Sequence, residues 1–151
     1  MRPLQLKLTG INSYREEQII DFETLTSQGL FGIFGPTGSG KSSILDAMTL
    51  ALYAKLPRDT KNFINTNEKK ANVSFLFSIT TDKTRKYLAE RSFRYHTGNN
   101  ASTVRNTTGR LILYEGDTET VLADKPTEVT NECIRLLGLT SEDFMRTVVL
   151  P

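Results

Sequence analysis

Residues 35–42 read Gly35-Pro36-Thr37-Gly38-Ser39-Gly40-Lys41-Ser42, which matches the pattern G-x-x-x-x-G-K-[ST] of a phosphate-binding loop. The glycines let the main chain adopt dihedral angles, and approach a ligand closely, in ways that a Cβ atom would prevent. Successive N–H groups can then converge on a phosphate. A helix that begins near Lys41 would add free N–H groups and the positive end of its dipole. The stretch therefore predicts a site for the phosphates of a nucleotide.

Each polar side chain of this loop has a defined role in nucleotide binding. Lys41 reaches the β- and γ-phosphates as a positive charge and is the candidate catalytic residue. The Ser42 hydroxyl is placed to ligate Mg²⁺, and Ser43 adds a donor beside the α-phosphate. The predicted phosphate-binding residues are Gly35, Thr37, Gly38, Ser39, Gly40, Lys41, Ser42 and Ser43.

The flanking sequence predicts a strand before the loop and a helix after it, which is the context that such a loop requires. Residues 30–34 are a short apolar run of the kind found in buried strands. This helix should end before Pro57, because the residue that precedes a proline is disfavoured in helical geometry. The apolar positions at helical spacing are Ile44, Ala47, Met48, Ala51 and Leu52.

Alternating apolar residues predict strands elsewhere in the chain. Two strands are expected upstream of the loop, at residues 4–9 and 17–22. A long β-hairpin is expected downstream, at residues 73–79 and 87–95, with a flexible tip at 97–108. The sheet should therefore be a mixed sheet that meets a P-loop core.

The last third of the chain predicts a second hairpin and two helices. The hairpin turns at Glu115-Gly116-Asp117, and Pro126 suits the first position of a helix that Gly138 ends. Residues 140–143 resemble the capping box of a short helix. The predicted fold class is α/β, a P-loop NTPase with an antiparallel β-hairpin subdomain, in one domain of 151 residues.

Composition restricts the class of protein. The formal net charge is +2, and the single cysteine, Cys133, excludes an intramolecular disulfide. Cys133 lies on a helical apolar stripe, which favours a buried thiol over a nucleophile. No apolar stretch of 18 residues occurs and the N-terminus has no signal-peptide pattern, so we expect a cytoplasmic protein that is not bound to a membrane.

The charges are unevenly distributed along the chain. Residues 83–110 carry seven basic residues against one glutamate, whereas residues 115–143 carry eight acidic residues against two basic ones. The basic stretch is interleaved with aromatic residues, so it could bind a nucleic-acid backbone through Arg91, Arg94 and Arg105. The alternative is a solvated hairpin face. Arg91 falls on the apolar side of its strand, which is also compatible with a structural role.

Part of a hydrolytic site is missing from the sequence. A P-loop enzyme that hydrolyses nucleotide also needs a carboxylate for Mg²⁺ and a group that orients the attacking water. The candidate strand that ends at Glu115 leads into a hairpin turn. Asp46 lies one helical turn after Ser42, where we expect it to bond with protein groups. The chain therefore carries half of an ATPase site.

At this point the chain resembles the SbcC family, the long coiled-coil ATPases of bacterial double-strand break repair that are related to the SMC proteins. The likeness extends over the whole chain, and the pairing of the P-loop with the last motif is its most specific part. The residues that carry it are Leu8, Gly10, Ser13, Tyr14, Ile20-Asp21-Phe22, residues 29–47, Ala71, Val73, Phe75, Tyr87, Arg91 and, at the end, Phe144, Arg146, Val148 and Leu150-Pro151.

The resemblance implies the N-terminal lobe of an ABC-ATPase-type head that binds ATP and Mg²⁺. In the family a C-terminal lobe of the same protein supplies the metal and water carboxylates. A glutamine that touches Mg²⁺ follows the Leu-Pro at which this chain stops, which implies a fragment cut at that loop. By position, Asn12 and Ile64 would contact the base and the ribose, although relatives often carry a basic residue in place of Asn12.

The resemblance also implies partners. Two heads form a homodimer around ATP, an SbcD-like nuclease subunit is controlled by that closure, and the head binds double-stranded DNA. Two other functions stay open on the sequence alone: a different ABC-type ATPase, such as an SMC-like or recombination protein, and a P-loop phosphotransferase. A phosphotransferase needs an acceptor pocket and a second basic clamp after the loop, and we find no motif for either.

Overall fold

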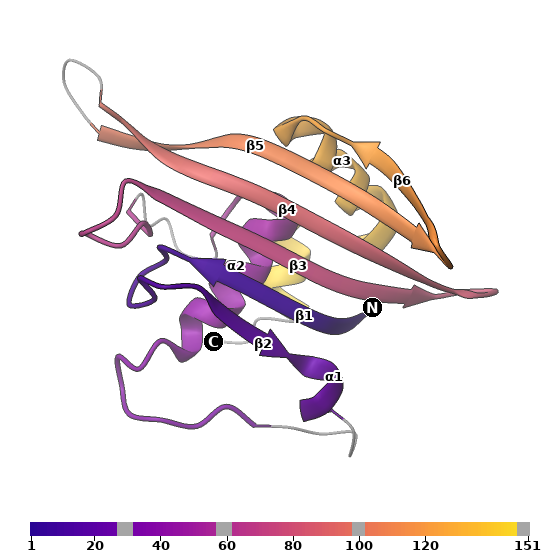
Figure 1. Ribbon diagram of the computed structural model, residues 1–151, viewed down its shortest axis with the longest axis horizontal. Helices are drawn as coiled ribbons and strands as arrows, with labels where there is room; N and C mark the ends of the chain where they lie inside the picture. Colours follow the sequence, from indigo (N-terminus) through magenta and orange to yellow (C-terminus); the bar gives the residue numbers. More distant parts are fainter. Residues whose placement is uncertain (27–31, 57–61, 98–101, 148–151) are drawn as a thin grey trace.

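The computed structural model describes residues 1–26, 32–56, 62–97 and 102–147, which form one antiparallel sheet with helices packed on it (Figure 1). In chain order the elements are β1 (Arg2–Thr9), β2 (Gln18–Asp21), α1 (Phe22–Leu25), α2 (Lys41–Tyr53), β3 (Lys70–Thr80), β4 (Thr84–Thr97), β5 (Ser102–Glu115), β6 (Thr118–Ala123), α3 (Pro126–Leu137) and α4 (Ser141–Thr147).

The sheet has six strands in the order β2-β1-β3-β4-β5-β6, and every neighbouring pair is antiparallel. The mixed sheet that the sequence predicted is therefore not found among the described residues, because no described strand precedes the loop and pairs in parallel. Both predicted hairpins are confirmed, as β3–β4 and β5–β6. The flexible tip predicted at 97–108 is wrong for residues 102–108, because β5 already begins at Ser102. Its polar residues gave no strand signal, but pairing along β4 satisfies their backbone groups. Opposite residues 107 and 108, a register shift between Ser92 and Phe93 absorbs one extra residue.

The core lies between one face of the sheet and the helices α2 and α3, which lie behind the strands in Figure 1. The predicted helix after the loop is confirmed, and it is buried on most sides, as expected for a helix packed between layers. Along β3 the burial alternates, so that Val73, Phe75 and Phe77 face these helices. None of the helices among the described residues has the length and hydropathy that crossing a bilayer requires.

The C-terminal helices are capped as the sequence predicts. Pro126 begins α3, and Gly138 ends it with a positive φ of 66°. The Thr140 hydroxyl accepts a hydrogen bond from the Asp143 N–H at 3.2 Å and donates one to the Asp143 carboxylate at 2.7 Å. This cap fixes the start of α4, and α4 then packs its buried Phe144 ring against Tyr53 of α2.

One predicted strand is not found among the residues that the structure describes. Of the apolar run 30–34, the first two residues lie outside the described part of the chain, and residues 32–34 belong to no strand. The side chains of Ile33 and Phe34 are 41% and 92% exposed. A strand requires a neighbour to pair with its backbone groups, and no described strand pairs with this segment. The sequence also predicts an extended segment at residues 147–151, and residues 148–151 of it lie outside the described part of the chain.

Arg91 of β4 joins three elements at the centre of the core. Its side chain is 2% exposed. Its guanidinium donates hydrogen bonds to Ala51 O at 2.8 Å and Leu52 O at 2.9 Å, both in the last turn of α2. It also donates to Pro126 O at 2.8 Å and Thr130 Oγ1 at 2.9 Å in α3. The helix carbonyls carry partial negative charge, which compensates a buried cation that forms no ion pair with a described carboxylate.

We predict that Arg91→Ala lowers the free energy of unfolding by about 3 kcal/mol or more, because it leaves buried carbonyls without donors. Arg94→Ala on the same strand is the control, since that side chain is exposed, and it should change stability by less than about 0.5 kcal/mol. Urea denaturation of the three proteins measures both values. Equal midpoints for the two variants would contradict the structural role of Arg91.

Candidate phosphate-binding site

The site is built where the loop enters α2. Gly40 has a φ of 91° and stands at the N-cap of α2, where no side chain caps the helix. The first-turn N–H groups of Lys41 and Ser42 are therefore available to an external acceptor. Gly38 also has a positive φ, of 85°, and a Cβ atom added there would meet nothing within 4 Å. The loop is open on the side from which a phosphate would approach.

The side chain of Lys41 folds back over the loop. Its Nζ donates to Gly35 O and Pro36 O, both at 2.7 Å, and lies 3.4 Å from Ser39 Oγ. The ammonium group thus stands above the same main-chain segment whose amides would face a phosphate. The structure brings Gly35, Ser39, Gly40 and Lys41 together as the motif predicts, and it leaves Ser42 exposed at the start of the helix.

The turn between β1 and β2 packs against the loop and supports it. Asn12 adopts a positive φ of 48°, and its Nδ2 donates to Ser43 Oγ at 2.9 Å. Ser43 is only 6% exposed, and because its oxygen accepts from Asn12, its own proton is free to be donated. Asn12 therefore contacts the first turn of α2 beside the loop, and its predicted contact with the base or ribose stays a prediction.

Two further side chains, Tyr14 and Ile64, differ in whether the sequence assigned them to the site. Tyr14 lies against Gly40, where its hydroxyl donates to Gly40 O at 3.4 Å. No motif assigns this role to Tyr14, and only the tight turn between two strands hinted at its position. Ile64 is 3% exposed and lies beside Ile11, so its predicted contact with the ribose or base also stays a prediction.

The residues present fit a nucleotide better than they fit a complete metal site. Three glycines, an uncapped helix start and a lysine are the donors that a triphosphate needs. Mg²⁺ is usually held by one or two carboxylates together with substrate phosphates. Among the described residues no group of three His, Cys, Asp or Glu side chains could hold a metal ion. Of the described residues, Ser42 is the one that the motif assigns to the metal.

Two other side chains that the sequence singled out, Glu115 and Cys133, have other environments. Glu115, which the sequence placed in a hairpin turn, forms ion pairs with Lys83 at 2.7 Å and Arg85 at 3.4 Å. The hydrogen bond from Lys83 is the main reason that the pKa of Glu115 lies below its ordinary value. Cys133 is buried, and burial raises the pKa of its thiol to about 12, which confirms an unreactive core cysteine.

Comparison with known proteins agrees with this geometry. A family model described as AAA domain matches residues 5–142. The chain belongs to the AAA domain family. This confirms the predicted α/β P-loop class. The sequence is 46% identical over 151 residues to the SbcC subunit of the nuclease SbcCD from Clostridium acetobutylicum. It is 49% identical over 154 residues to the protein of the same name from Bacillus subtilis.

A third relative is a probable DNA double-strand break repair Rad50 ATPase from Aquifex aeolicus, 34% identical over 156 residues. Each alignment covers the whole of this AAA domain chain but only 13%, 13% and 14% of the three relatives. The chain therefore corresponds to a small part of the proteins it resembles.

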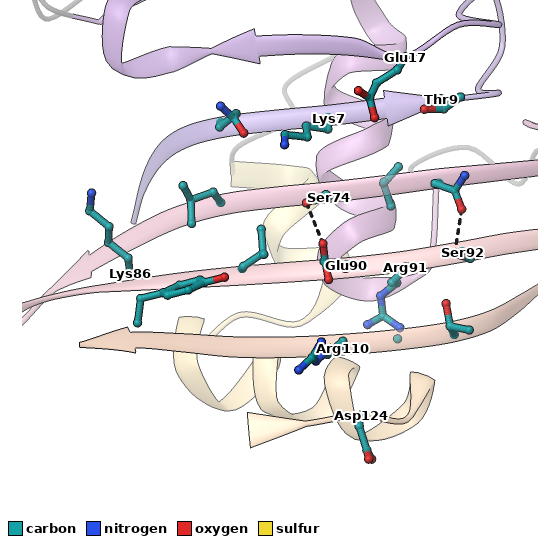
Figure 2. Close-up of a pocket in the computed structure, with 18 of the residues that line it drawn as sticks. Lys7, Thr9, Glu17, Ser74, Lys86, Glu90, Arg91, Ser92, Arg110 and Asp124 are labelled. Carbon is teal, nitrogen blue, oxygen red and sulfur yellow. Dashed lines mark hydrogen bonds between the residues drawn. The ribbon is translucent and has the colours of Figure 1, made fainter. Parts of the chain in front are cut away.

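The open face of the AAA domain's sheet carries the predicted basic stretch. Side chains of β1, β3, β4 and β5 line a hollow of about 1040 Å³ on this face, among them Lys7, Lys86 and Arg110 (Figure 2). Glu17, Glu90 and Asp124 also line it, so the hollow itself has mixed charge. This part of the surface therefore fits the alternative interpretation of the stretch 83–110, a solvated hairpin face.

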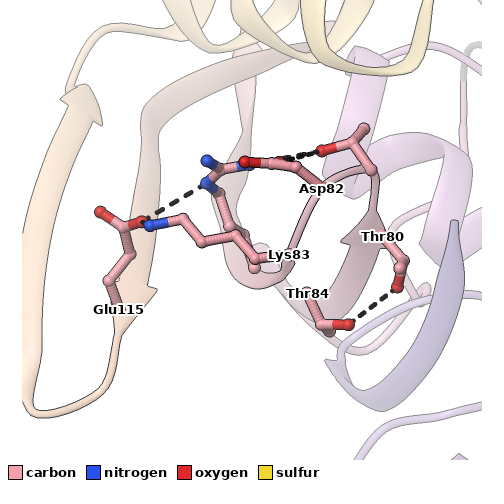
Figure 3. Close-up of polar contacts among 7 residues, drawn as sticks. Thr80, Asp82, Lys83, Thr84 and Glu115 are labelled. Atoms are coloured by element: carbon pink, nitrogen blue, oxygen red, sulfur yellow. Dashed lines mark hydrogen bonds and ion pairs between the residues drawn. The ribbon is translucent and has the colours of Figure 1, made fainter.

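Arg94 and Arg105 differ from the rest of the stretch. They lie directly opposite each other on β4 and β5, both are exposed, and no described acidic side chain forms an ion pair with either. By contrast, Lys83 forms an ion pair with Glu115, and Arg85 forms ion pairs with both Asp82 and Glu115, near the β3–β4 turn (Figure 3).

Arg91 is buried in the core, so the nucleic-acid role predicted for Arg91 is wrong and the structural alternative holds.

We predict that Gly40→Ala destabilises the AAA domain by about 1–3 kcal/mol more than Gly38→Ala does. Both glycines have a positive φ, so both variants incur backbone strain. Only at position 40 would the new Cβ atom also lie 2.8 Å from the Tyr14 ring. Thermal unfolding of the two variants separates the steric cost of the new Cβ atom from the cost of backbone strain. Equal losses of stability in the two variants would contradict the contact between Gly40 and Tyr14.

Proposed function

We propose that this chain is the ATP-binding half of the ATPase head in a DNA double-strand break repair nuclease complex of the SbcCD type. The observation that carries the proposal is the loop of residues 35–42 at the uncapped start of α2, with Lys41 folded over it. Its ligands would be ATP and Mg²⁺, with Lys41 on the β- and γ-phosphates and Ser42 on the metal.

The hydrolytic site is completed by a C-terminal lobe of the same protein. Two features support this. The described residues offer no acidic cluster for the metal. The segment that enters the loop exposes the apolar side chains of Ile33 and Phe34 to solvent. Exposed apolar side chains indicate a contact surface, which a strand from another part of the protein would cover. The first relatives are more than seven times longer than this chain, which leaves ample sequence for such a lobe.

The remaining partners follow from the names of the relatives. The proteins from Clostridium acetobutylicum and Bacillus subtilis are each named as one subunit of the nuclease SbcCD, so a nuclease subunit of the SbcD kind is the expected companion. We further propose that two heads dimerise around ATP in the cytoplasm and that this closure regulates the processing of DNA ends.

Double-stranded DNA would bind to the β4–β5 hairpin through Arg94 and Arg105. Like charges directly opposite each other on neighbouring strands destabilise a sheet. A phosphate placed between these two guanidinium groups would convert that repulsion into attraction. No other described pair of basic residues in the stretch 83–110 is both directly opposed and free of ion pairs.

We predict that Lys41→Ala in the full-length protein weakens ATP binding by about 1.5–3 kcal/mol, the scale of a hydrogen bond to a charged group. Lys55→Ala, just beyond the far end of the same helix, is the matched control and should bind ATP as the unaltered protein does. Isothermal titration calorimetry measures all three. Equal affinities for the Lys41 variant and the unaltered protein would refute the proposed role, and phosphate transfer to an acceptor by this chain alone would favour a phosphotransferase.

For DNA, we predict that replacing Arg94 and Arg105 together by Ala weakens duplex binding and lowers the salt slope of log K by about 2, one for each lost phosphate contact. Replacing Arg2 and Arg15 removes the same charge elsewhere and should leave the slope unchanged. Fluorescence anisotropy of a labelled duplex over a range of salt concentrations provides the measurement. An unchanged slope for the hairpin variant would return this surface to the solvated-face interpretation.

A further inference from the structure

The turn that follows β1 is in direct contact with the last glycine of the loop. The Tyr14 hydroxyl lies 3.4 Å from Gly40 O. A Cβ atom added to Gly40 would lie 2.8 Å from Tyr14 Cζ and Oη and 2.9 Å from Ser13 Oγ. These distances mean that the ring and the neighbouring serine pack directly on the backbone of Gly40, with no space between them.

The turn itself is held rigidly. Ile11 and Tyr14 exchange two backbone hydrogen bonds, at 3.0 and 2.8 Å. The Asn12 N–H donates to Phe63 O at 2.8 Å, and Asn65 Nδ2 donates to Asn12 O at 2.6 Å. Ile11 has no exposed surface. The turn is thus fixed to both the sheet and residues 63–65, and the Tyr14 ring has a firm base from which to support the loop.

The other support of the loop is polar: Lys41 Nζ donates to Gly35 O and Pro36 O, and the Ser39 N–H donates to Pro36 O. Apolar packing is scarce. Residues 35–39 are exposed, and no atom lies within 4 Å of the position that a Gly38 Cβ would take. Phe34, which leads into the loop, is 92% exposed and provides no packing. Glycine explores positive and negative φ about equally, so Gly40 would not hold its φ of 91° without external contacts.

We propose that Tyr14 is a positioning residue for the phosphate site, which acts through Gly40. By fixing Gly40 in the left-handed region, its ring sets the direction in which α2 begins and so where the N–H groups of Lys41 and Ser42 point. The proposal rests on the ATP binding proposed above. It does not require Tyr14 to touch the nucleotide.

The ring contributes more than the hydroxyl. At 3.4 Å the hydrogen bond to Gly40 O is long, whereas the ring edge is in van der Waals contact with the glycine. A phenylalanine would keep the steric support and lose only the weak bond. An alanine would leave a gap beside Gly40 and let the loop populate conformations in which its amides diverge.

The test measures ATP affinity in the full-length protein well below its melting temperature. We expect Tyr14→Ala to raise the Kd for ATP about tenfold and Tyr14→Phe to leave it within about twofold of the original. Tyr114→Ala is the control, because Tyr114 is also half-buried but lies on β5, away from the loop. It should lower the melting temperature and leave the Kd unchanged.

Three results would overturn the proposal: an unchanged Kd for Tyr14→Ala, a tenfold loss of affinity for Tyr14→Phe, or an equal loss of affinity for Tyr114→Ala. If Tyr14→Ala does not fold, Tyr14→Leu replaces it, and a Kd within twofold of the original would then overturn the proposal. Failure of the proposed function would give a different result from failure of the Tyr14 proposal. In that case the unaltered protein would bind no ATP, and Lys41→Ala would not change ATP binding.

Discussion

The guanidinium of Arg91 is the interaction on which the arrangement of the layers depends. It projects from the middle of β4 into the core and bonds to the last turn of α2 and the first two turns of α3. A buried cation is costly unless its charge and its donors are satisfied. Here the carbonyl end of α2 meets both needs. Burial lowers the pKa of Arg91 to about 10, so the side chain remains charged at neutral pH.

The consequence is that α2 is held at both ends. Arg91 fixes its C-terminal end to the sheet, and the turn of residues 11–14 fixes its N-terminal end through Gly40 and Ser43. Between these ends the helix is buried among apolar side chains. A helix that is fixed in this way presents the N–H groups of its first turn in a constant direction, which is what a site for a charged ligand requires.

Much of this could be predicted from local patterns. The loop motif, the helix after it, both hairpins and the caps at Pro126, Gly138 and Thr140 each depend on a few neighbouring residues, and all of them are found. The role of Arg91 was harder to predict, because an arginine in a basic stretch has the same sequence signature whether it is exposed or buried. Only its position on the apolar side of β4 indicated the core. Tyr14 could not have been assigned, since its role depends on a contact across 26 positions of the chain.

The strand expected at 30–34 is not found among its described residues, 32–34, for a different reason. Its apolar residues predict burial, but burial needs a partner, and no described strand lies next to it. The expectation and the structure are reconciled if the partner belongs to another part of the same protein. The exposed Phe34 and the missing metal carboxylates would then have one cause, because the lobe that covers the first would also supply the second.

The most direct test is a structure of the full-length protein with a non-hydrolysable ATP analogue and Mg²⁺. The account predicts that the triphosphate accepts hydrogen bonds from the amides of residues 38–42 and from Lys41 Nζ, and that Phe34 is buried beneath a second lobe. A nucleotide bound elsewhere, with Lys41 still closed on Gly35 O and Pro36 O, would contradict it.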